Sequence, residues 1–530
     1  VDRVSTTGAA FLGLTLGCAR CHDHKYDPIS QREFYQLFAL FNNADEPAFP
    51  VPTDQQAKEM PALLAEIEQT EKRLAEVDAN SGGRQAEWEG KFAGPLALDR
   101  TVLEREAPTS ADHDVLKLPQ AVRDALAAPR ESRTAEQKQA LKLEFQKVDP
   151  ERLPLAKQIA ELKQRQTQIA AATTTTMIVR ERTEPRETYI HVRGDFLHPG
   201  APVQGDVPQV LPPISARGQM PDRLDFARWL VDPNNPLTPR VTVNRLWQAY
   251  FGQGLVATEN DFGLQGDRPT HPELLDWLAG QLTEHGWSLK VMHRLIVTSA
   301  TYRQSSRMRG ELAAADPYNK LLGRQQRLRL EAESIRDVSL AASGLLCREI
   351  GGPGVYPPQP EGIYRFTQQV KYWGENKNAD RFRRGMYTYF WRSSPYPFLK
   401  TFDAPDANVA CTRRARSNTP LQALTLANDR AFFEIAQGFA LQLLAGSWVT
   451  DSERIQTAFR RCLARDPSPS ELAGLTEFLA SQRKRFASSP QDIVTVAPIN
   501  RPSQVDPIQA ATWTMLARVL LNLDEFVTRE

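Results

Sequence analysis

The sequence lacks a hydrophobic run long enough to span a bilayer, and its mean hydropathy is −0.46. It also lacks a surplus of either charge, since 65 basic and 64 acidic residues leave a formal net charge of +1. A chain without an overall positive field has no general attraction for nucleic acid or for an anionic membrane surface. We therefore expect a globular protein with no transmembrane segment and no nucleic-acid partner.

Cysteine is scarce, and its distribution excludes a disulfide framework. There are five cysteines, an odd number, and Cys347, Cys411 and Cys462 are widely separated. The patterns H-E-x-x-H, G-x-S-x-G and the P-loop are also missing, so no common motif indicates a hydrolase or nucleotide-binding site. Neither an initiator Met nor a signal-peptide pattern is present, from which we expect a fragment or a processed chain.

The remaining two cysteines belong to the stretch GLTLGCARCHDHKYDPIS, in which Cys18, Cys21 and His22 have C-x-x-C-H spacing. Covalent haem attachment needs two thiols, two residues apart, that bond the vinyl groups at one porphyrin edge. A histidine directly after the second cysteine then ligates the iron. The motif therefore predicts haem c attached to Cys18 and Cys21, with His22 as an axial ligand.

His24 lies too near His22 to reach the opposite haem face, so we expect it to contact His22 or a haem propionate, with a solvated loop histidine as the alternative. A competing interpretation is a zinc site of Cys18, Cys21, His22 and His24. Cys21 and His22 are adjacent, however, and are hard to place on one tetrahedron. The sequence leaves the ligand of the opposite haem face open among Met60, His113, Met177, His191, His198, Met220 or none.

Composition and periodicity predict a mainly α protein of four regions. Residues 1–52 hold the Cys/His motif and one helix, and residues 53–172 are expected to form a long helical hairpin or short coiled coil. Residues 173–220 are expected to form two or three strands and a Pro/Gly-rich loop, and residues 221–530 are expected to be mostly helical. Capping-box spacing predicts helix starts in four places: Ser30 with Glu33, Thr270 with Glu273, Thr419 with Gln422, and Ser468 with Glu471.

Two arginine-rich stretches are candidate binding sites. Arg413, Arg414, Arg416 and Asn418 precede an expected helix N-terminus and form a possible anion or ligand site, but pairing with buried carboxylates such as Asp403 or Asp406 is the favoured interpretation. In the stretch 380–398, arginines alternate with aromatic residues. A half-buried strand is favoured there over a stacking platform for sugars or single-stranded nucleic acid.

Several longer stretches resemble known families. GLTLGCARCHDHKYDPISQREFYQLFALFNN is similar to the end of the planctomycete-type cytochrome c-like domain, domain of unknown function 1549. RLDFARWLVDPNNPLTPRVTVNRLWQAYFGQGLV, MHRLIVTSATYRQSS and FDAPDANVACTRRARSNTPLQALTLANDRAFF resemble the planctomycete-specific domain of unknown function 1553. The resemblance implies a partial cytochrome c-like helical unit at residues 1–52 and places haem ligation on Cys18, Cys21 and His22. It assigns no activity.

The leading expectation is an extracytoplasmic c-type haem protein, at the periplasm or cell surface, with an electron-transfer or redox role and an unidentified partner. A second hypothesis is a surface binding or assembly protein with a structural Cys/His metal site and a glycan or protein ligand. A third is an enzyme whose site forms only in the fold, for which a deep pocket lined by Arg413, Arg416, Asp403 and Asn244 would be the sign.

Overall fold

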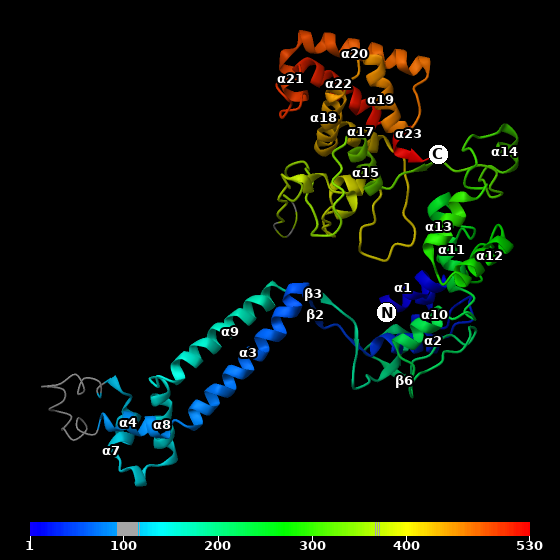
Figure 1. The fold of residues 1–530 in the computed structure, drawn as a ribbon. Coiled ribbons are helices and arrows are strands. Elements are labelled where there is room, and N and C mark those ends of the chain that lie inside the picture. Colours follow the sequence, from blue (N-terminus) through cyan, green and yellow to red (C-terminus); the bar gives the residue numbers. More distant parts are fainter. Residues whose placement is uncertain (93–114, 116, 366, 368, 370, 530) are drawn as a thin grey trace. The chain divides into compact units, whose positions relative to one another are not determined.

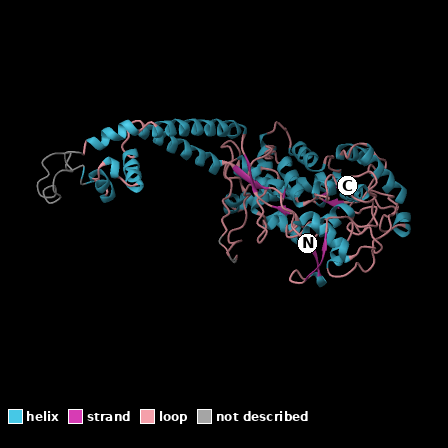
Figure 2. Ribbon diagram, turned by 90° about the horizontal axis from the view of Figure 1, so that it is seen from below, coloured by secondary structure: helices cyan, strands magenta, loops and turns pink. Residues whose placement is uncertain are grey.

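The computed structural model describes residues 1–92, 115, 117–365, 367, 369 and 371–529. It is mainly α-helical, as predicted, and the strands of the described residues pair as two-stranded sheets (Figures 1 and 2). The chain divides into two compact units, Val1–Asn42 with Arg186–Glu530, and Asn43–Pro185. Within the described residues, no helix has both the length and the apolar composition that a bilayer crossing requires.

The unit of residues 43–185 is a helical hairpin on a short β base (Figure 1). Its elements are β1 (Ala44–Asp45), β2 (Ala48–Val51), α3 (Asp54–Ala79), α4 (Gly82–Gly90), α7 (Gln120–Ala127), η4 (Arg130–Ser132), α8 (Ala135–Gln146), α9 (Arg152–Ala172), β3 (Thr174–Met177) and β4 (Arg180–Glu181). Strands β1 and β4 pair antiparallel, as do β2 and β3. Helices α3 and α9 therefore run antiparallel, side by side, as the sequence predicts.

The second arm of this hairpin is interrupted. It breaks at residues 147–151 into α8 and α9. Pro150 follows Asp149, and a residue before proline is disfavoured in helical conformation. The buried Asp149 carboxylate accepts hydrogen bonds from Arg84 Nε at 3.1 Å and from the Glu151 amide at 3.1 Å. At this end of the hairpin, Trp88, Phe92 and Phe145 belong to a small separate core.

The larger unit begins with the segment that carries the Cys/His motif. Its first elements are α1 (Asp2–Thr7), the π-helical η1 (Gly8–Leu12), the 3₁₀ helix η2 (Leu16–Arg20), α2 (Gln31–Asn42), β5 (Thr188–His191), η5 (Val192–Gly194), β6 (Pro199–Val203) and α10 (Arg223–Leu230). Strands β5 and β6 form an antiparallel hairpin. One core joins these elements and includes Leu12, Phe34, Tyr35, Val203 and Trp229.

The remaining elements of this unit are almost all helices. They are α11 (Thr238–Phe251), α12 (Pro272–Glu284), α13 (Leu289–Thr298), α14 (Gly310–Ala315), β7 (Leu328–Arg329), α15 (Ala332–Ala342), η6 (Ala379–Phe382), η7 (Gly385–Tyr387), α16 (Pro397–Thr401), α17 (Pro420–Asn428), α18 (Arg430–Ala445), α19 (Asp451–Leu463), α20 (Pro469–Ser488), α21 (Pro490–Val496), α22 (Pro507–Leu521), α23 (Asp524–Val527) and β8 (Thr528–Arg529). Helices α11 to α13 share one core, and a second surrounds α18 and α22. Strand β7 pairs with β8.

The motif segment is seated directly on α11 and on the loop that follows it. Gly13 has φ +60°, and a Cβ atom there would lie 2.7 Å from Phe262 and 2.9 Å from Val241. The Gly13 carbonyl accepts a hydrogen bond from the Phe262 amide at 2.7 Å, and the buried Asp27 carboxylate accepts one from the Leu264 amide at 2.7 Å. Residues 1–42 therefore fold as part of the same body as α11.

Three of the four predicted capping boxes are confirmed, and one is wrong. Helices α2, α17 and α20 begin directly after Ser30, Thr419 and Ser468, and in each the cap hydroxyl and the acidic or amide partner exchange hydrogen bonds with the backbone. Helix α12 instead begins at Pro272, after His271. The Thr270 amide donates to the Leu255 carbonyl at 2.9 Å, so Thr270 anchors a loop and does not cap the helix.

The strand predicted within residues 380–398 is also wrong. The stretch forms the 3₁₀ helices η6 and η7, with isolated bridges at Arg383 and Thr388. The Asp337 carboxylate accepts hydrogen bonds from Arg384 Nε at 2.7 Å and from the Gly385 amide at 2.6 Å. These bonds draw the backbone against α15, where a Cβ atom on Gly385 would lie 2.6 Å from Glu333 Cα.

Candidate functional site

The loop between η1 and α2 presents the cysteine motif. Leu16 and Ala19 are buried and hold the short helix η2 on the core, whereas Cys18, Cys21 and His22 are exposed. Both thiols are free, with no disulfide between them. A short 3₁₀ helix places neighbouring residues on different sides, so anchoring of the apolar residues turns the motif residues outward. The structure therefore presents both sulfur atoms to solvent.

A tight turn of the β5–β6 hairpin supports Cys21. Arg193 and Gly194 both have positive φ, 54° and 77°, and a Cβ atom on Gly194 would lie only 2.7 Å from Cys21 Sγ. Arg20 Nη2 donates to the Gly194 carbonyl at 3.1 Å. Glycine is therefore required at position 194 on two grounds, its left-handed backbone and its close approach to the thiol.

His22 has an orientation that leaves one ring nitrogen available. Its Nδ1 atom lies 2.6 Å from the Asp23 carbonyl oxygen, a distance at which Nδ1–H donates. A proton on Nδ1 places the lone pair of the neutral ring on Nε2, and the ring as a whole is exposed. Nε2 can then bind a metal while the Nδ1 bond fixes the direction of the ring.

His24 is directed inward and holds the loop. Its side chain is 4% exposed, and its Nδ1 accepts a hydrogen bond from the Asp27 amide at 2.8 Å. Its Nε2 lies 3.2 Å from Thr15 Oγ1. Both ring nitrogens are thus engaged within the loop, and contact of His24 with a haem edge stays a prediction.

A zinc tetrad is not assembled at this loop. Cys18, Cys21 and His22 face solvent, whereas the His24 ring is buried beneath them. Across the described part of the chain, no group of three or more His, Cys, Asp or Glu side chains is arranged to hold a metal ion. The geometry therefore gives the zinc interpretation no support.

Behind the motif, Tyr35 and His191 connect the loop to the hairpin. Tyr35 donates its hydroxyl hydrogen to the Arg20 carbonyl at 3.2 Å, and its ring centroid lies 5.0 Å from that of His191. Burial raises the pKa of Tyr35. Burial, and after it the neighbouring Arg20 guanidinium, lowers the pKa of His191, which favours the neutral form of its ring.

The predicted ligands for the opposite haem face are dispersed. His191 and His198 flank the turn that touches Cys21, but His198 Nδ1 lies 2.8 Å from an Asp195 carboxylate oxygen. Met60 and Met177 belong to the unit of residues 43–185, and Met220 is exposed. His113 lies outside the described residues. Among the candidates that the structure describes, no second axial ligand stands out.

The arginines of the 411–418 segment do pair with carboxylates, but the partners are not the predicted Asp403 and Asp406. Arg414 Nη1 lies 3.0 Å from Glu331 and 2.7 Å from Glu333, and Arg416 Nη2 lies 3.4 Å from Glu331. Arg413 lies 3.9 Å from Glu259. The predicted partners Asp403 and Asp406 are engaged elsewhere, Asp406 with Asn408.

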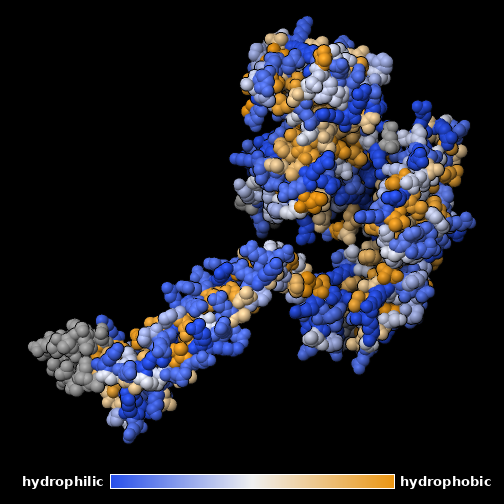
Figure 3. All heavy atoms as spheres, viewed as in Figure 1, coloured by the Kyte–Doolittle hydropathy of each residue, from blue (hydrophilic) through white to orange (hydrophobic). Residues whose placement is uncertain are grey.

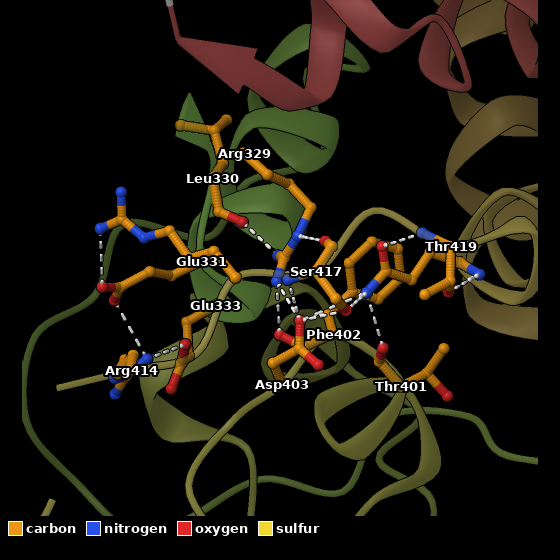
Figure 4. A network of polar contacts seen from close by, with 12 residues as sticks. Arg329, Leu330, Glu331, Glu333, Thr401, Phe402, Asp403, Arg414, Ser417 and Thr419 are labelled. Atoms are coloured by element: carbon orange, nitrogen blue, oxygen red, sulfur yellow. Dashed lines mark hydrogen bonds and ion pairs between the residues drawn. The ribbon is translucent and has the colours of Figure 1, made fainter. Parts of the chain in front are cut away.

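Asp403 instead organises a buried network around Arg329 (Figure 4). Its carboxylate contacts the Arg329 guanidinium and accepts hydrogen bonds from the Ser417 amide and hydroxyl, both at 2.8 Å. These donors lower the pKa of Asp403 against the opposing effect of its own burial, which is the largest single influence. Gln422, the N3 residue of α17, donates to the Thr401 carbonyl at 3.0 Å. The network is structural and fixes the start of α17.

The pocket expected for an enzyme, with Asp403 and Asn244 in its walls, does not form. Asn244 is fully buried, and its amide exchanges two hydrogen bonds with the backbone of Val256 at 2.9 and 3.0 Å. Asn418 points elsewhere, with its amide 3.3 Å from Asp524. Arg413 and Arg416 do line cavities, together with Arg245 and Gln248. Neither Arg245 nor Gln248 was predicted as a site residue, because both lie on an ordinary amphipathic helix more than 150 positions away.

Two family models match the chain. One, described as a protein of unknown function (DUF1549), covers residues 1–46, and the other, described as a protein of unknown function (DUF1553), covers residues 222–479. Their order is the one that the sequence motifs predict. No curated protein and no solved structure gives a significant match.

Proposed function

We propose that this protein is a c-type haem protein that transfers electrons. The two family models that match it, DUF1549 followed by DUF1553, assign no function, so the proposal is argued from the protein's own site. Thioether bonds to Cys18 and Cys21 would hold the haem, and His22 would ligate the iron through Nε2. Bound haem supplies one-electron redox chemistry. The single observation that supports this proposal most is the His22 ring, fixed through Nδ1 by a carbonyl beside two exposed thiols.

The surroundings of the motif suit a large apolar ligand. The turn that touches Cys21 continues into exposed apolar side chains: Val192 is 51% exposed, Phe196 73% and Leu197 69%. On the face drawn in Figure 3, most of the surface is hydrophilic and apolar residues lie in separate patches. Exposed apolar groups beside a binding motif gain stability when a ligand covers them. These side chains would shield one edge of the haem from water.

The protein's own residues have distinct roles in this proposal. Tyr35 and Gln31 both donate to the Arg20 carbonyl, which fixes the backbone between the two cysteines and keeps the thiol spacing. His24 and Asp27 hold the segment that follows His22. Attachment of c-type haem normally takes place outside the cytoplasmic membrane, so the proposal also places the working protein there.

The test is expression of the chain, behind a secretion leader, in a host that matures c-type haem, followed by a pyridine haemochrome spectrum and haem staining of the denatured protein. We expect covalent haem in the natural sequence and none in a Cys18→Ser, Cys21→Ser double variant. The matched control is Cys411→Ser, which removes another exposed cysteine and should keep the haem. His22→Ala should keep the thioether bonds while changing the visible spectrum and the midpoint potential.

Two results would contradict the proposal. One is a folded protein with no haemochrome α-band that contains stoichiometric zinc by elemental analysis, which would favour the structural metal site. The other is haem that is lost on denaturation, because such haem is not bonded to Cys18 and Cys21.

A further inference from the structure

The arginine-rich segment 411–416 forms a wall shared by two cavities, of about 430 and 640 Å³. The smaller cavity is also lined by Arg245, Gln248 and Gly252 of the α11 region and by Glu331. Volumes of this size are typical of small-molecule sites. All of these residues belong to the larger compact unit.

Positive charge exceeds negative charge around the smaller cavity. Four guanidinium groups, those of Arg245, Arg413, Arg414 and Arg416, line it, whereas Glu259, Glu331 and Glu333 are the carboxylates within 4 Å of them. Glu331 is shared between Arg414 and Arg416. Arg414 is therefore well neutralised. Arg413, with its one contact at 3.9 Å and a side chain 54% exposed, has most of its donors free.

Arg245 is a cation without a carboxylate partner in the described part of the chain. It donates to the backbone carbonyls of Ala9 and Ala10 and to Asn260 Oδ1 at 3.3 Å. Burial lowers its pKa, and the nearby Glu259 carboxylate opposes this effect only in part. A partly buried guanidinium held only by neutral oxygens raises the electrostatic potential of the cavity that it lines.

Gln248 adds a polar side chain to the wall of the cavity. Its side chain lines the cavity and is 9% exposed, yet its amide makes no hydrogen bond to any residue that the structure describes. Unlike Arg245 Nε, which is enclosed and has no partner among the described residues, the Gln248 amide reaches the open space of the cavity. An amide that faces a cavity without a partner is one that a bound molecule can satisfy.

We propose that this cavity, which we call the 411–416 cavity, binds a small organic molecule through an oxyanion group: a carboxylate, phosphate or sulfate. Arg413 and Arg416 bind the oxyanion with charge-assisted hydrogen bonds, and the Gln248 amide binds a polar group on the same molecule. Arg245 adds long-range attraction. This site is independent of the haem proposal, and either can fail without the other.

Cys411 makes the occupancy of the cavity measurable. Its exposed thiol lines both cavities, so a bound ligand should slow its alkylation by iodoacetamide, a neutral reagent. The rate is measured by peptide mass mapping of the full chain in sodium citrate, phosphate or sulfate, each against sodium chloride at equal ionic strength. Glutathione in the same solution serves as the reference thiol. We expect at least one oxyanion to slow Cys411 alkylation about fivefold or more, and the three arms identify which oxyanion is preferred.

Variants separate binding from a general salt effect. Arg413→Gln and Arg416→Gln should each raise the anion concentration needed for half-protection about tenfold, and Gln248→Glu should abolish protection through charge repulsion. The matched control is Arg460→Gln on α19, which removes an exposed guanidinium paired with Asp466 and should change nothing. Arg413 is exposed, so its variant tests the proposal even if Arg416→Gln fails to fold.

Two outcomes would overturn the proposal. One is equal alkylation of Cys411 in chloride and in all three oxyanions. The other is protection that persists unchanged in Arg413→Gln and Gln248→Glu.

Discussion

Substitution of Gly13 by alanine tests whether the cysteine motif depends on its seat against α11. Two costs are expected. An L-residue at φ +60° loses about 1–2 kcal/mol, and overpacking of a closed core site costs typically about 1–3 kcal/mol more. The added Cβ would lie 2.7 Å from a ring carbon of Phe262 and 2.9 Å from a methyl carbon of Val241, so the neighbours must move. The sum is about 2–5 kcal/mol.

Gly286 provides a matched control for this substitution. It has the same φ of +60°, but no atom lies within 4 Å of the position where its Cβ would be. Gly286→Ala therefore carries the backbone cost alone, about 1–2 kcal/mol. The difference between the two variants measures the packing cost at Gly13, about 1–3 kcal/mol.

The assay is urea unfolding followed by far-ultraviolet circular dichroism, with hydrogen exchange of the peptides that cover residues 8–20. We expect the Gly13 variant to show the larger loss of stability, faster exchange in those peptides and a lower yield of attached haem. Equal destabilisation by Gly13→Ala and Gly286→Ala, with unchanged exchange at residues 8–20, would refute the reasoning, because the motif segment would then not be seated on Phe262 and Val241.

Two further predictions concern the hairpin behind the motif and the unit of residues 43–185. The pKa of His191 is lowered, so its neutral ring contributes stability above the ordinary histidine pKa, and this contribution is lost as pH falls through that range. His191→Gln should therefore show a smaller drop in melting temperature between pH 7.5 and 5 than the natural protein; equal drops would contradict the assignment. Replacement of residues 43–185 by a short Gly/Ser linker should leave the rest folded, because Asn42 Nδ2 donates to Thr188 Oγ1 at 3.0 Å and the ends already meet. Loss of helical circular dichroism beyond that of the removed helices would show otherwise.

Local signals in the sequence predicted local structure well. The box of Ser30 and Glu33 predicted the start of α2 to the residue, because both partners lie within one turn of the same helix. The same holds for Thr419 and Ser468. The capping box predicted at Thr270 is wrong for two reasons. A proline two residues later starts the helix, and the Thr270 amide donates a hydrogen bond to the distant carbonyl of Leu255.

Contacts between distant segments could not be predicted, since nothing local records them. Asp403 was expected to pair with the arginines of residues 413–416, which lie nearby in sequence. It forms its ion pair with Arg329 instead, 74 positions away. In the sequence, Gln248 is one polar residue of an ordinary amphipathic helix. Only the fold shows that its side chain lines a cavity, without a hydrogen-bond partner among the described residues. The alternation of 380–398 indicated a strand, whereas Asp337 on α15 draws Gly385 into a turn.

The boundaries of the family matches and of the folded units differ for a physical reason. The DUF1549 match ends at residue 46 and the DUF1553 match begins at 222, yet α2 and the β5–β6 hairpin share one core with α10. Arg245 of the second match is bonded to Ala9 and Ala10 of the first, only eight positions before Cys18. A displacement of α11 would therefore pull on the segment that leads into the cysteine motif, because the Gly13–Phe262 contact leaves no space for independent movement. Residues 43–185 enter and leave this body beside Asn42 and Thr188, so their helices can vary in length without disturbing it.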